Sequence, residues 1–274
     1  MSAGAGRAIA VNALLAVFAI VSLVPLAWML SVSFMPAGAA STLPPPLLPP
    51  SFTLDNYRDL FARAGMGRYL ANSFLVASVA TLGALLINVM AGYAFAKLQF
   101  AGRERLFRLL VGALVIPAQV AMMPLFLELK ALGLVNSYLG AVLPSLASIF
   151  GIYLVRQYAR SIPDELLEAA RIDGASETAI FVRVVVPLLK PVIVSLAVFT
   201  FLGTWNDFMW PLIILTDESH FTLPVALASL SREHVQDNEL MMAGAVVTVL
   251  PVLLLFLVLQ KHYIAGLLAG GVKG

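Results

Sequence analysis

Long runs without charged residues alternate with short charged segments along most of this chain. Crossing the roughly 30 Å hydrocarbon core of a bilayer as a helix takes about 20 apolar residues. Six runs meet this requirement: 8–30, the run between Arg68 and Lys97, 109–127, the run between Lys130 and Arg156, 191–215 and 240–260. The pattern therefore predicts an all-α, polytopic membrane protein with six transmembrane helices.

The composition agrees with this class. Apolar residues make up 61% and charged residues 12% of the 274 residues, whereas a soluble domain has about 45–50% and about 25%. The chain has no cysteine, and its three histidines, His220, His234 and His262, are far apart. The sequence also lacks the GxxxxGK[ST] loop that holds ATP phosphates. We therefore predict no catalytic residue, no metal site and no cofactor on this chain.

The distribution of lysine and arginine predicts the orientation of the spans. Five of the 17 fall in loops on one side, namely Arg58, Arg63, Arg68, Lys130 and Arg232, and the other twelve lie at the termini and in loops on the opposite side. Loops rich in Lys and Arg stay in the cytoplasm. Both termini are therefore predicted to be cytoplasmic.

The last predicted cytoplasmic loop, 157–190, combines charge with helix signals. Ser161, followed by Asp164, resembles a capping box, and Pro163 suits a first helical turn. Gly174 is a typical residue after a helix C-terminus. We predict a short helix over 163–173, with Leu166, Ala169, Ala170 and Asp173 on one face, and a second helical run that ends at Pro187. An interfacial helix on lipid headgroups is the alternative, but the central alanines favour close contact with protein.

The spacing in this loop resembles a family motif. Glu168, Ala169 and Ala170, then Gly174 and Pro187, match the EAA loop of bacterial ABC importer permeases, the binding-protein-dependent transport inner-membrane components. The chain departs from the pattern at Val184 and Val186, where isoleucine and leucine are usual. "TWNDFMWPLIIL" at 204–215 and "GLLAGGVKG" at 266–274 resemble the sugar-importing branch, which includes the shorter membrane subunit of the maltose transporter.

The resemblance implies an organisation and a set of partners. Residues 1–66 would hold the N-terminal end, the first span and a Pro-rich outer loop. Residues 67–263 would form a five-helix permease core with the coupling loop 157–190, and 264–274 a cytoplasmic tail. The partners would be a second, different permease, two ATPase subunits that bind ATP and Mg, and an extracytoplasmic solute-binding protein, all at the bacterial inner membrane.

It also implies roles for particular residues. Glu168 would pair with a basic residue in a groove of the ATPase, and Ala169 and Ala170 would allow close approach. Gly174 would make the turn, and Pro187 would redirect the chain towards the membrane. These residues, together with Asp173, are the predicted ATPase-coupling set. In the tail, Gly270, Gly271 and Lys273 would dock between the ATPase subunits.

Asp207 is the one carboxylate within a predicted span. It could belong to the solute pathway together with Thr204 and Asn206. The alternative places it near the outer, water-exposed end of the fifth span, with Trp205 and Trp210 as anchors at the membrane interface. For the other mid-span polar residues, Asn88 and Gln119, hydrogen bonds between helices are favoured over contact with a solute.

These observations predict a transport subunit without enzymatic activity of its own. The expected solute is a sugar or an oligosaccharide, and glycerol-3-phosphate or another polar solute is the alternative. A proton-coupled secondary transporter is less well supported, because such proteins use relays of buried carboxylates or histidines, and only Asp207 qualifies.

Overall fold

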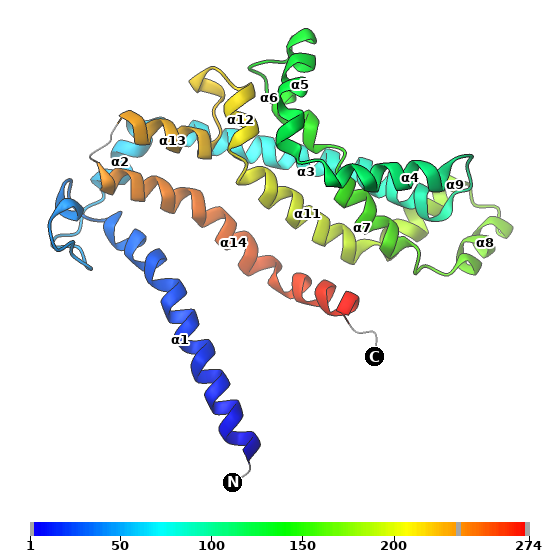
Figure 1. Cartoon of the computed structure of the whole chain (residues 1–274), viewed down its shortest axis with the longest axis horizontal. Helices are drawn as coiled ribbons and strands as arrows, with labels where there is room; N and C mark the ends of the chain where they lie inside the picture. The colour runs from blue at the N-terminus through cyan, green and yellow to red at the C-terminus, as the bar shows by residue number, and fades with distance from the viewer. Residues whose placement is uncertain (1–2, 234–236, 272–274) are drawn as a thin grey trace. The chain divides into compact units, whose positions relative to one another are not determined.

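The fold is seen in a computed structural model that describes the backbone of residues 3–233 and 237–271 and the side chains of 7–231 and 237–258. All regular elements in these residues are helical (Figure 1). The α-helices are α1 (Ala3–Val32), α2 (Asp55–Ala62), α3 (Met66–Lys97), α4 (Arg103–Gly112), α5 (Ala118–Ala131), α6 (Tyr138–Val142), α7 (Ile149–Ala159), α8 (Asp164–Ile172), α9 (Glu177–Ile180), α10 (Val186–Leu188), α11 (Lys190–Trp205), α12 (Met209–Ile214), α13 (Leu223–Glu233) and α14 (Asn238–Gly271).

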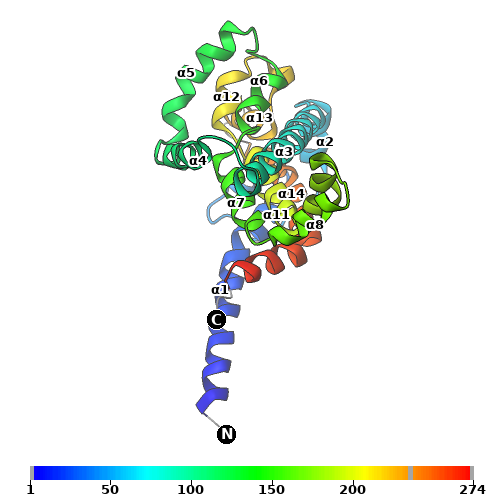
Figure 2. The same cartoon turned by 90° about the vertical axis from the view of Figure 1, so that its right-hand side faces the viewer.

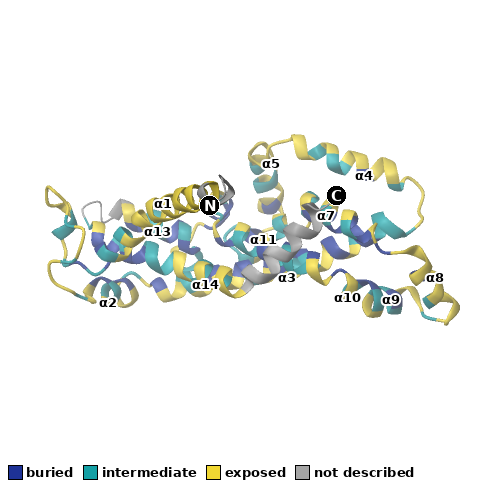
Figure 3. Cartoon of the chain, turned by 90° about the horizontal axis from the view of Figure 1, so that it is seen from below, coloured by how far each residue is buried: buried dark blue, intermediate teal, exposed yellow. Residues whose placement is uncertain are grey.

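The chain divides into two compact units, Met1–Arg68 with Leu223–Leu253, and Tyr69–Thr222 with Leu254–Gly274. In the first unit, α1 exposes nearly all of its apolar side chains, as a span surrounded by lipid would (Figure 3). The segment after α1 is held by the buried side chain of Asn56, which donates hydrogen bonds to the carbonyls of Ser33 and Met35. The fully buried carboxylate of Glu239 accepts the backbone N–H of Ala40 at 2.6 Å.

The second unit contains α3–α12 and has a core at each end. One buried cluster joins α3, α7 and α11 to the loop that carries α8, α9 and α10, and consists of Val89, Tyr93, Val155, Ala159, Ile162, Leu167, Ile180, Val185, Leu189, Val192 and Leu196. The other joins α3, α5, α6 and α12, and consists of Val76, Ala80, Leu129, Ala141, Val142, Trp210, Ile214 and Leu215. Apolar packing therefore connects the predicted cytoplasmic loop directly to the membrane helices.

Three described helices are long and apolar enough to cross a membrane by themselves: Arg7–Val32, Met66–Lys97 and Asn238–Val258. Three bent pairs of helices bring the number to as many as six if each pair is one span. The prediction of an all-α membrane protein is confirmed, and six spans remain compatible with the structure.

The predicted third span, 109–127, is not one continuous helix. The chain bends by 106° between its two halves, Arg103–Val115 and Ala118–Ala131. Figure 2 shows the sharp turn between α4 and α5. The break lies at Ile116 and Pro117, both of which have extended backbone. Proline has no N–H to donate and disfavours helical geometry in the residue before it. Pro124 lies inside α5 and does not interrupt it.

The predicted fifth span, 191–215, is also interrupted. The helix α11 ends at Trp205, and α12 begins at Met209 after a short non-helical segment that contains Asp207. With 16 residues, α11 is about 24 Å long, which is less than the thickness of the hydrocarbon core. The interruption places Asp207 outside regular helix, between α11 and α12.

Candidate coupling loop and polar pocket

The helix predicted over 163–173 is present as α8, but it does not begin with a capping box. Pro163 is the N-cap residue, and no side chain accepts a hydrogen bond there. The hydroxyl of Ser161 instead donates to the carbonyl of Tyr158 at 2.7 Å. The carboxylate of Asp164 is engaged by a residue from another helix, so it is not available as a partner for Ser161.

That residue is Lys97, the last residue of α3. Its Nζ donates to the carboxylate of Asp164 at 2.6 Å and to the carbonyl of Ile162 at 2.5 Å. The Lys97 side chain is only 6% exposed, so its stem is packed inside the protein. The hydrogen bond and charge of Lys97 lower the pKa of Asp164. The start of α8 is therefore tied to the end of a membrane-spanning helix.

The end of α8 is a complete Schellman motif, as the prediction for Gly174 required. Gly174 has a φ of +81°. Its N–H donates to the carbonyl of Arg171 at 3.0 Å, and the N–H of Ala175 donates to the carbonyl of Ala170 at 3.0 Å. This pair of bonds defines the motif and needs a left-handed residue at the position of Gly174.

An ion pair closes the turn after α8. The guanidinium of Arg171 contacts the carboxylate of Glu177 through Nε at 2.6 Å and Nη2 at 3.3 Å. This pair lowers the pKa of Glu177 and raises that of Arg171. Ser176 caps the next helix, α9, by accepting the N–H of Ala179 at 3.3 Å. Hydrogen bonds and an ion pair therefore fix the backbone on both sides of the turn between α8 and α9.

The predicted face of α8 is mostly exposed, and of its four residues only Ala170 is partly buried. Leu167 is 2% exposed and Ala170 packs against the core, whereas Glu168 and Ala169 are exposed. Leu166 and Ile172, on the outward side, are 44% and 87% exposed. Asp173 and Gly174 are also exposed. We call the outward-facing set Leu166, Glu168, Ala169 and Ile172 the α8 edge.

The charges of α8 do not suit the interfacial alternative. A helix that lies on lipid headgroups usually has Lys and Arg on its polar face. The α8 helix has three carboxylates, Asp164, Glu165 and Glu168, and its one cation, Arg171, is paired with Glu177. Contact with a basic protein surface therefore fits α8 better than contact with anionic lipid.

Pro187 does not end the second helical run, although the prediction placed the break there. The run continues from α9 through a π-helical turn, Phe181–Val185, into α10, which contains Pro187. The wider turn before the proline removes the usual clash of its ring with a preceding carbonyl. The chain bends by 76° between Glu177–Leu188 and Lys190–Trp205, so the change of direction lies between Pro187 and Pro191.

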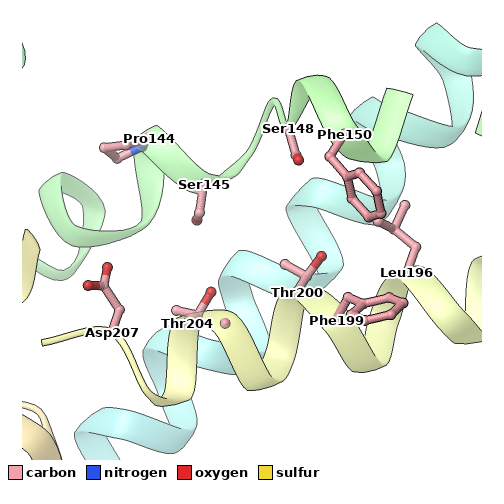
Figure 4. Close-up of a pocket in the computed structure, with 10 residues that line it drawn as sticks. Pro144, Ser145, Ser148, Phe150, Leu196, Phe199, Thr200, Thr204 and Asp207 are labelled. Atoms are coloured by element: carbon pink, nitrogen blue, oxygen red, sulfur yellow. The ribbon is translucent and has the colours of Figure 1, made fainter. Parts of the chain in front are cut away.

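A pocket of about 340 Å³ with both apolar and polar lining residues lies between α11 and the segment that connects α6 to α7 (Figure 4). It is lined by Pro144, Ser145, Ser148, Phe150, Leu196, Phe199, Thr200, Gly203, Thr204 and Asp207. Two of the three predicted pathway residues, Thr204 and Asp207, therefore share one hollow. Asn206 does not line it, because its side chain is exposed and donates to the carbonyl of Leu202 at 2.8 Å.

The tryptophans beside Asp207 are not interface anchors. Trp205 and Trp210 are 1% and 6% exposed, and the indole N–H of Trp210 donates to the carbonyl of Gly140 at 3.1 Å. The partly buried carboxylate of Asp207 accepts the backbone N–H of Trp210 at 3.4 Å. The alternative that placed Asp207 among surface tryptophans is therefore wrong in this respect, because the aromatic rings pack inward.

The two other mid-span polar residues differ. Asn88 is fully buried, and its Oδ1 accepts the N–H of Ser148 at 3.0 Å, which confirms a hydrogen bond between helices. Gln119 is exposed, and no other described residue bonds to its side chain, so a hydrogen bond from it to another helix stays a prediction. Gln119 lies in the first turn of α5, directly after the proline break.

No group of three histidine, aspartate or glutamate side chains that could hold a metal occurs among the described residues. Of the predicted tail site, Gly270 and Gly271 are described only as backbone at the end of α14, and Lys273 lies outside the described residues. Sequence analysis missed Lys97, Glu177, Ser145 and Ser148. For Lys97 and the two serines no local signal exists, because their partners are distant in sequence.

Comparison with known proteins assigns the family. Residues 88–267 match the family described as "Binding-protein-dependent transport system inner membrane component". The arabinooligosaccharides transport system permease protein of Halalkalibacterium halodurans is 37% identical over 263 residues, 96% of this chain and 93% of that protein. The diacetylchitobiose uptake system permease protein of Streptomyces coelicolor is 33% identical over 264 residues, 95% of this chain and 87% of that protein.

A solved structure has the same fold. The crystal structure of a bacterial ABC transporter involved in the import of the acidic polysaccharide alginate contains a chain that matches with a TM-score of 0.83 and 27% identity. The match covers 95% of this chain and 98% of the other. The sequence motif, the helical fold and these similarities lead to one assignment: the chain belongs to the family of inner-membrane permease components of binding-protein-dependent ABC importers.

Proposed function

We propose that this chain forms half of the transmembrane pathway of an ATP-driven importer of a sugar or oligosaccharide. Relatives that cover almost all of the chain are named for arabinooligosaccharides and diacetylchitobiose. Glycerol-3-phosphate or another polar solute is the second candidate. The single observation that carries the coupling role is the α8 edge, a motif-bearing surface that is exposed while the opposite side of α8 packs against the membrane helices and Lys97 holds its first residue.

The α8 edge has the chemistry of a docking surface for a basic groove. Glu168 supplies a carboxylate, Ala169 leaves room for close approach, and Ile172 supplies apolar contact. The groove belongs to an ATPase subunit, which binds ATP and Mg. Because Lys97 anchors the start of α8 and the buried core supports its inner face, a displacement of α8 is transmitted to α3 and α11. Asp173, Gly174 and Pro187 shape this joint without facing the groove.

The complete importer contains further chains. We propose a second, different permease, two ATPase subunits and an extracytoplasmic solute-binding protein. Both termini lie in the cytoplasm, as the Lys and Arg distribution indicates, and the tail with Gly270, Gly271 and Lys273 docks between the ATPase subunits. Hydrolysis of ATP occurs on the ATPase chains, and this chain binds no cofactor. The absence of a chain of buried acids in the sequence favours this arrangement over a proton-coupled secondary transporter.

The substitution Glu168→Lys tests the coupling role. A cation at this position would face the cation of the groove, and a buried charge that has lost its partner costs roughly 3–5 kcal/mol. We expect ATP-dependent uptake in vesicles to be abolished while the chain still reaches the membrane. An acidic substitution in the groove of the ATPase should restore part of the uptake.

The matched control is Thr178→Lys, which adds a cation at an exposed position of the same loop outside the motif. It should leave uptake near the level of the unmodified chain. Glu177→Lys is not a suitable control, because the carboxylate of Glu177 holds Arg171. Normal uptake with Glu168→Lys, or equal loss with Thr178→Lys, would show that α8 does not couple through this carboxylate.

A further inference from the structure

The pocket beside α11 has a composition that distinguishes between classes of solute. Its one ionisable lining residue is Asp207, and no lysine, arginine or histidine of the described residues lines it. The other polar groups are the hydroxyls of Ser145, Ser148, Thr200 and Thr204. Figure 4 shows the carboxylate of Asp207 and these hydroxyls turned towards the same space.

The hydroxyls retain capacity for a ligand. Ser145 donates to the carbonyl of Val142 at 2.6 Å and can still accept, and Ser148 accepts the N–H of Gly151 at 3.2 Å and can still donate. Within the described part of the chain, Thr200 and Thr204 have no hydrogen bond to their hydroxyls. A hydroxyl is both donor and acceptor, whereas an ionised carboxylate only accepts. The pocket therefore offers several donors and acceptors around one strong acceptor.

One wall of the pocket is apolar. Phe150 of α7 and Phe199 of α11 have ring centroids 6.1 Å apart and meet edge to face at 86°. Together with Leu196 they cover the side of the hollow opposite Asp207 (Figure 4). A ligand that fits has hydroxyls at one edge and C–H groups on a face, which describes a sugar ring.

We propose that this pocket is a contact site for neutral glycosyl units and that Asp207 selects against anionic solutes. The carboxylate accepts hydrogen bonds from two neighbouring hydroxyls of a sugar, and bonds to a charged group are stronger than bonds between neutral groups. A phosphate or a uronate in the same place would meet a like charge that no lining cation compensates. This inference rests on the proposed function and deepens it, because it separates neutral sugars from glycerol-3-phosphate.

The test uses the complete importer in proteoliposomes, with its partner permease, ATPases and binding protein. Radiolabelled arabinotriose and maltotriose are the neutral probes, and glycerol-3-phosphate and trigalacturonate are the anionic probes. We expect ATP-dependent uptake of a neutral probe and none of either anionic probe. Asp207→Asn keeps an acceptor for the N–H of Trp210 but removes the charge, and should lower uptake of the neutral probe about tenfold, the effect of losing one charged hydrogen bond.

A second variant distinguishes loss of a solute contact from damage to the folded structure. Thr204→Val has nearly the same shape and removes a hydroxyl that has no partner in the described chain, so assembly and thermal stability should not change while uptake falls severalfold. Two controls lie outside the pocket: Ser195→Ala removes a hydroxyl from the same helix, and Glu128→Gln removes an exposed carboxylate. Both should transport normally.

Each outcome decides one question. Uptake of an anionic probe alone, or unchanged neutral uptake in both Asp207→Asn and Thr204→Val, overturns the pocket assignment and leaves the permease role intact. If no probe enters in an ATP-dependent manner, the proposed sugar import itself fails. Neutral uptake that falls in both variants but not in the controls supports the inference.

Discussion

The substitution Gly174→Val asks whether the shape of the loop, rather than its charge, carries motion from the ATPase to the membrane helices. Gly174 has a φ of +81°, and a Cβ built at this position meets no heavy atom within 4 Å. A Cβ at this position therefore has open space around it. The cost that we attribute to a valine there comes from the left-handed backbone, which L-residues avoid.

The size of this cost follows from the two ways in which the loop can respond. If the backbone keeps its geometry, the left-handed conformation costs an L-residue roughly 1–2 kcal/mol, and a β-branched residue more. If the backbone relaxes, the two bonds of the Schellman motif, both 3.0 Å long, are lost. Each contributes about 0.5–1.5 kcal/mol. Both responses disfavour the native turn by about 1–3 kcal/mol, and every 1.4 kcal/mol is a factor of ten.

The assay is ATP-dependent uptake into vesicles, with ATP hydrolysis stimulated by the binding protein measured in parallel. We expect Gly174→Val to reduce both about ten- to hundredfold, while membrane insertion is normal. Gly174→Asn should be milder than Gly174→Ala, because asparagine tolerates the left-handed region better than other non-glycine residues. A graded series of this kind would identify backbone conformation as the cause.

The matched control is Gly102→Val. Gly102 also has a φ of +81° and open space around its Cβ position, but it lies in a different loop, directly before α4. The valine has the same local backbone cost there and leaves the turn after α8 unchanged, so this variant should retain most of the uptake. If Gly102→Val is as damaging as Gly174→Val, or if Gly174→Val transports normally, the turn after α8 has no special role in coupling.

Two further predictions follow from buried and paired carboxylates. Glu239→Ala removes the acceptor for the N–H of Ala40, so we expect the free energy of unfolding of the purified complex, measured by thermal unfolding, to fall by about 1–3 kcal/mol. Glu239→Gln keeps an acceptor and should lose less. An alanine variant as stable as the unmodified chain would contradict this. The pKa values of Asp164 and Glu177 are lowered by Lys97 and Arg171, so their stabilisation is complete above the ordinary pKa of about 4 and is lost only as the pH falls through the lower folded values. The loop amides should therefore be equally protected from hydrogen exchange at about pH 5 and about pH 8, and should lose protection only below about pH 4. A loss of protection between about pH 5 and about pH 8 would disprove the role of these pairs.

Much of this protein could be predicted from local sequence. The apolar runs predict spans because the cost of placing charge in a bilayer depends on composition and length, which are properties of a segment alone. The extent of α8 and the turn at Gly174 were also predictable, since a Schellman motif is formed by residues a few positions apart.

Only the tertiary structure determined which residues far apart in sequence contact one another. Lys97 and Asp164 are 67 residues apart, and their contact replaces the predicted capping box. The inward turn of Ala170 and the outward turn of Ala169 depend on where the core meets α8. The pocket unites Ser145, Ser148 and Asp207 from different helices and connecting segments. No local sequence pattern predicts these contacts. They depend on which side chains lie close together in space, and the packing between helices determines that.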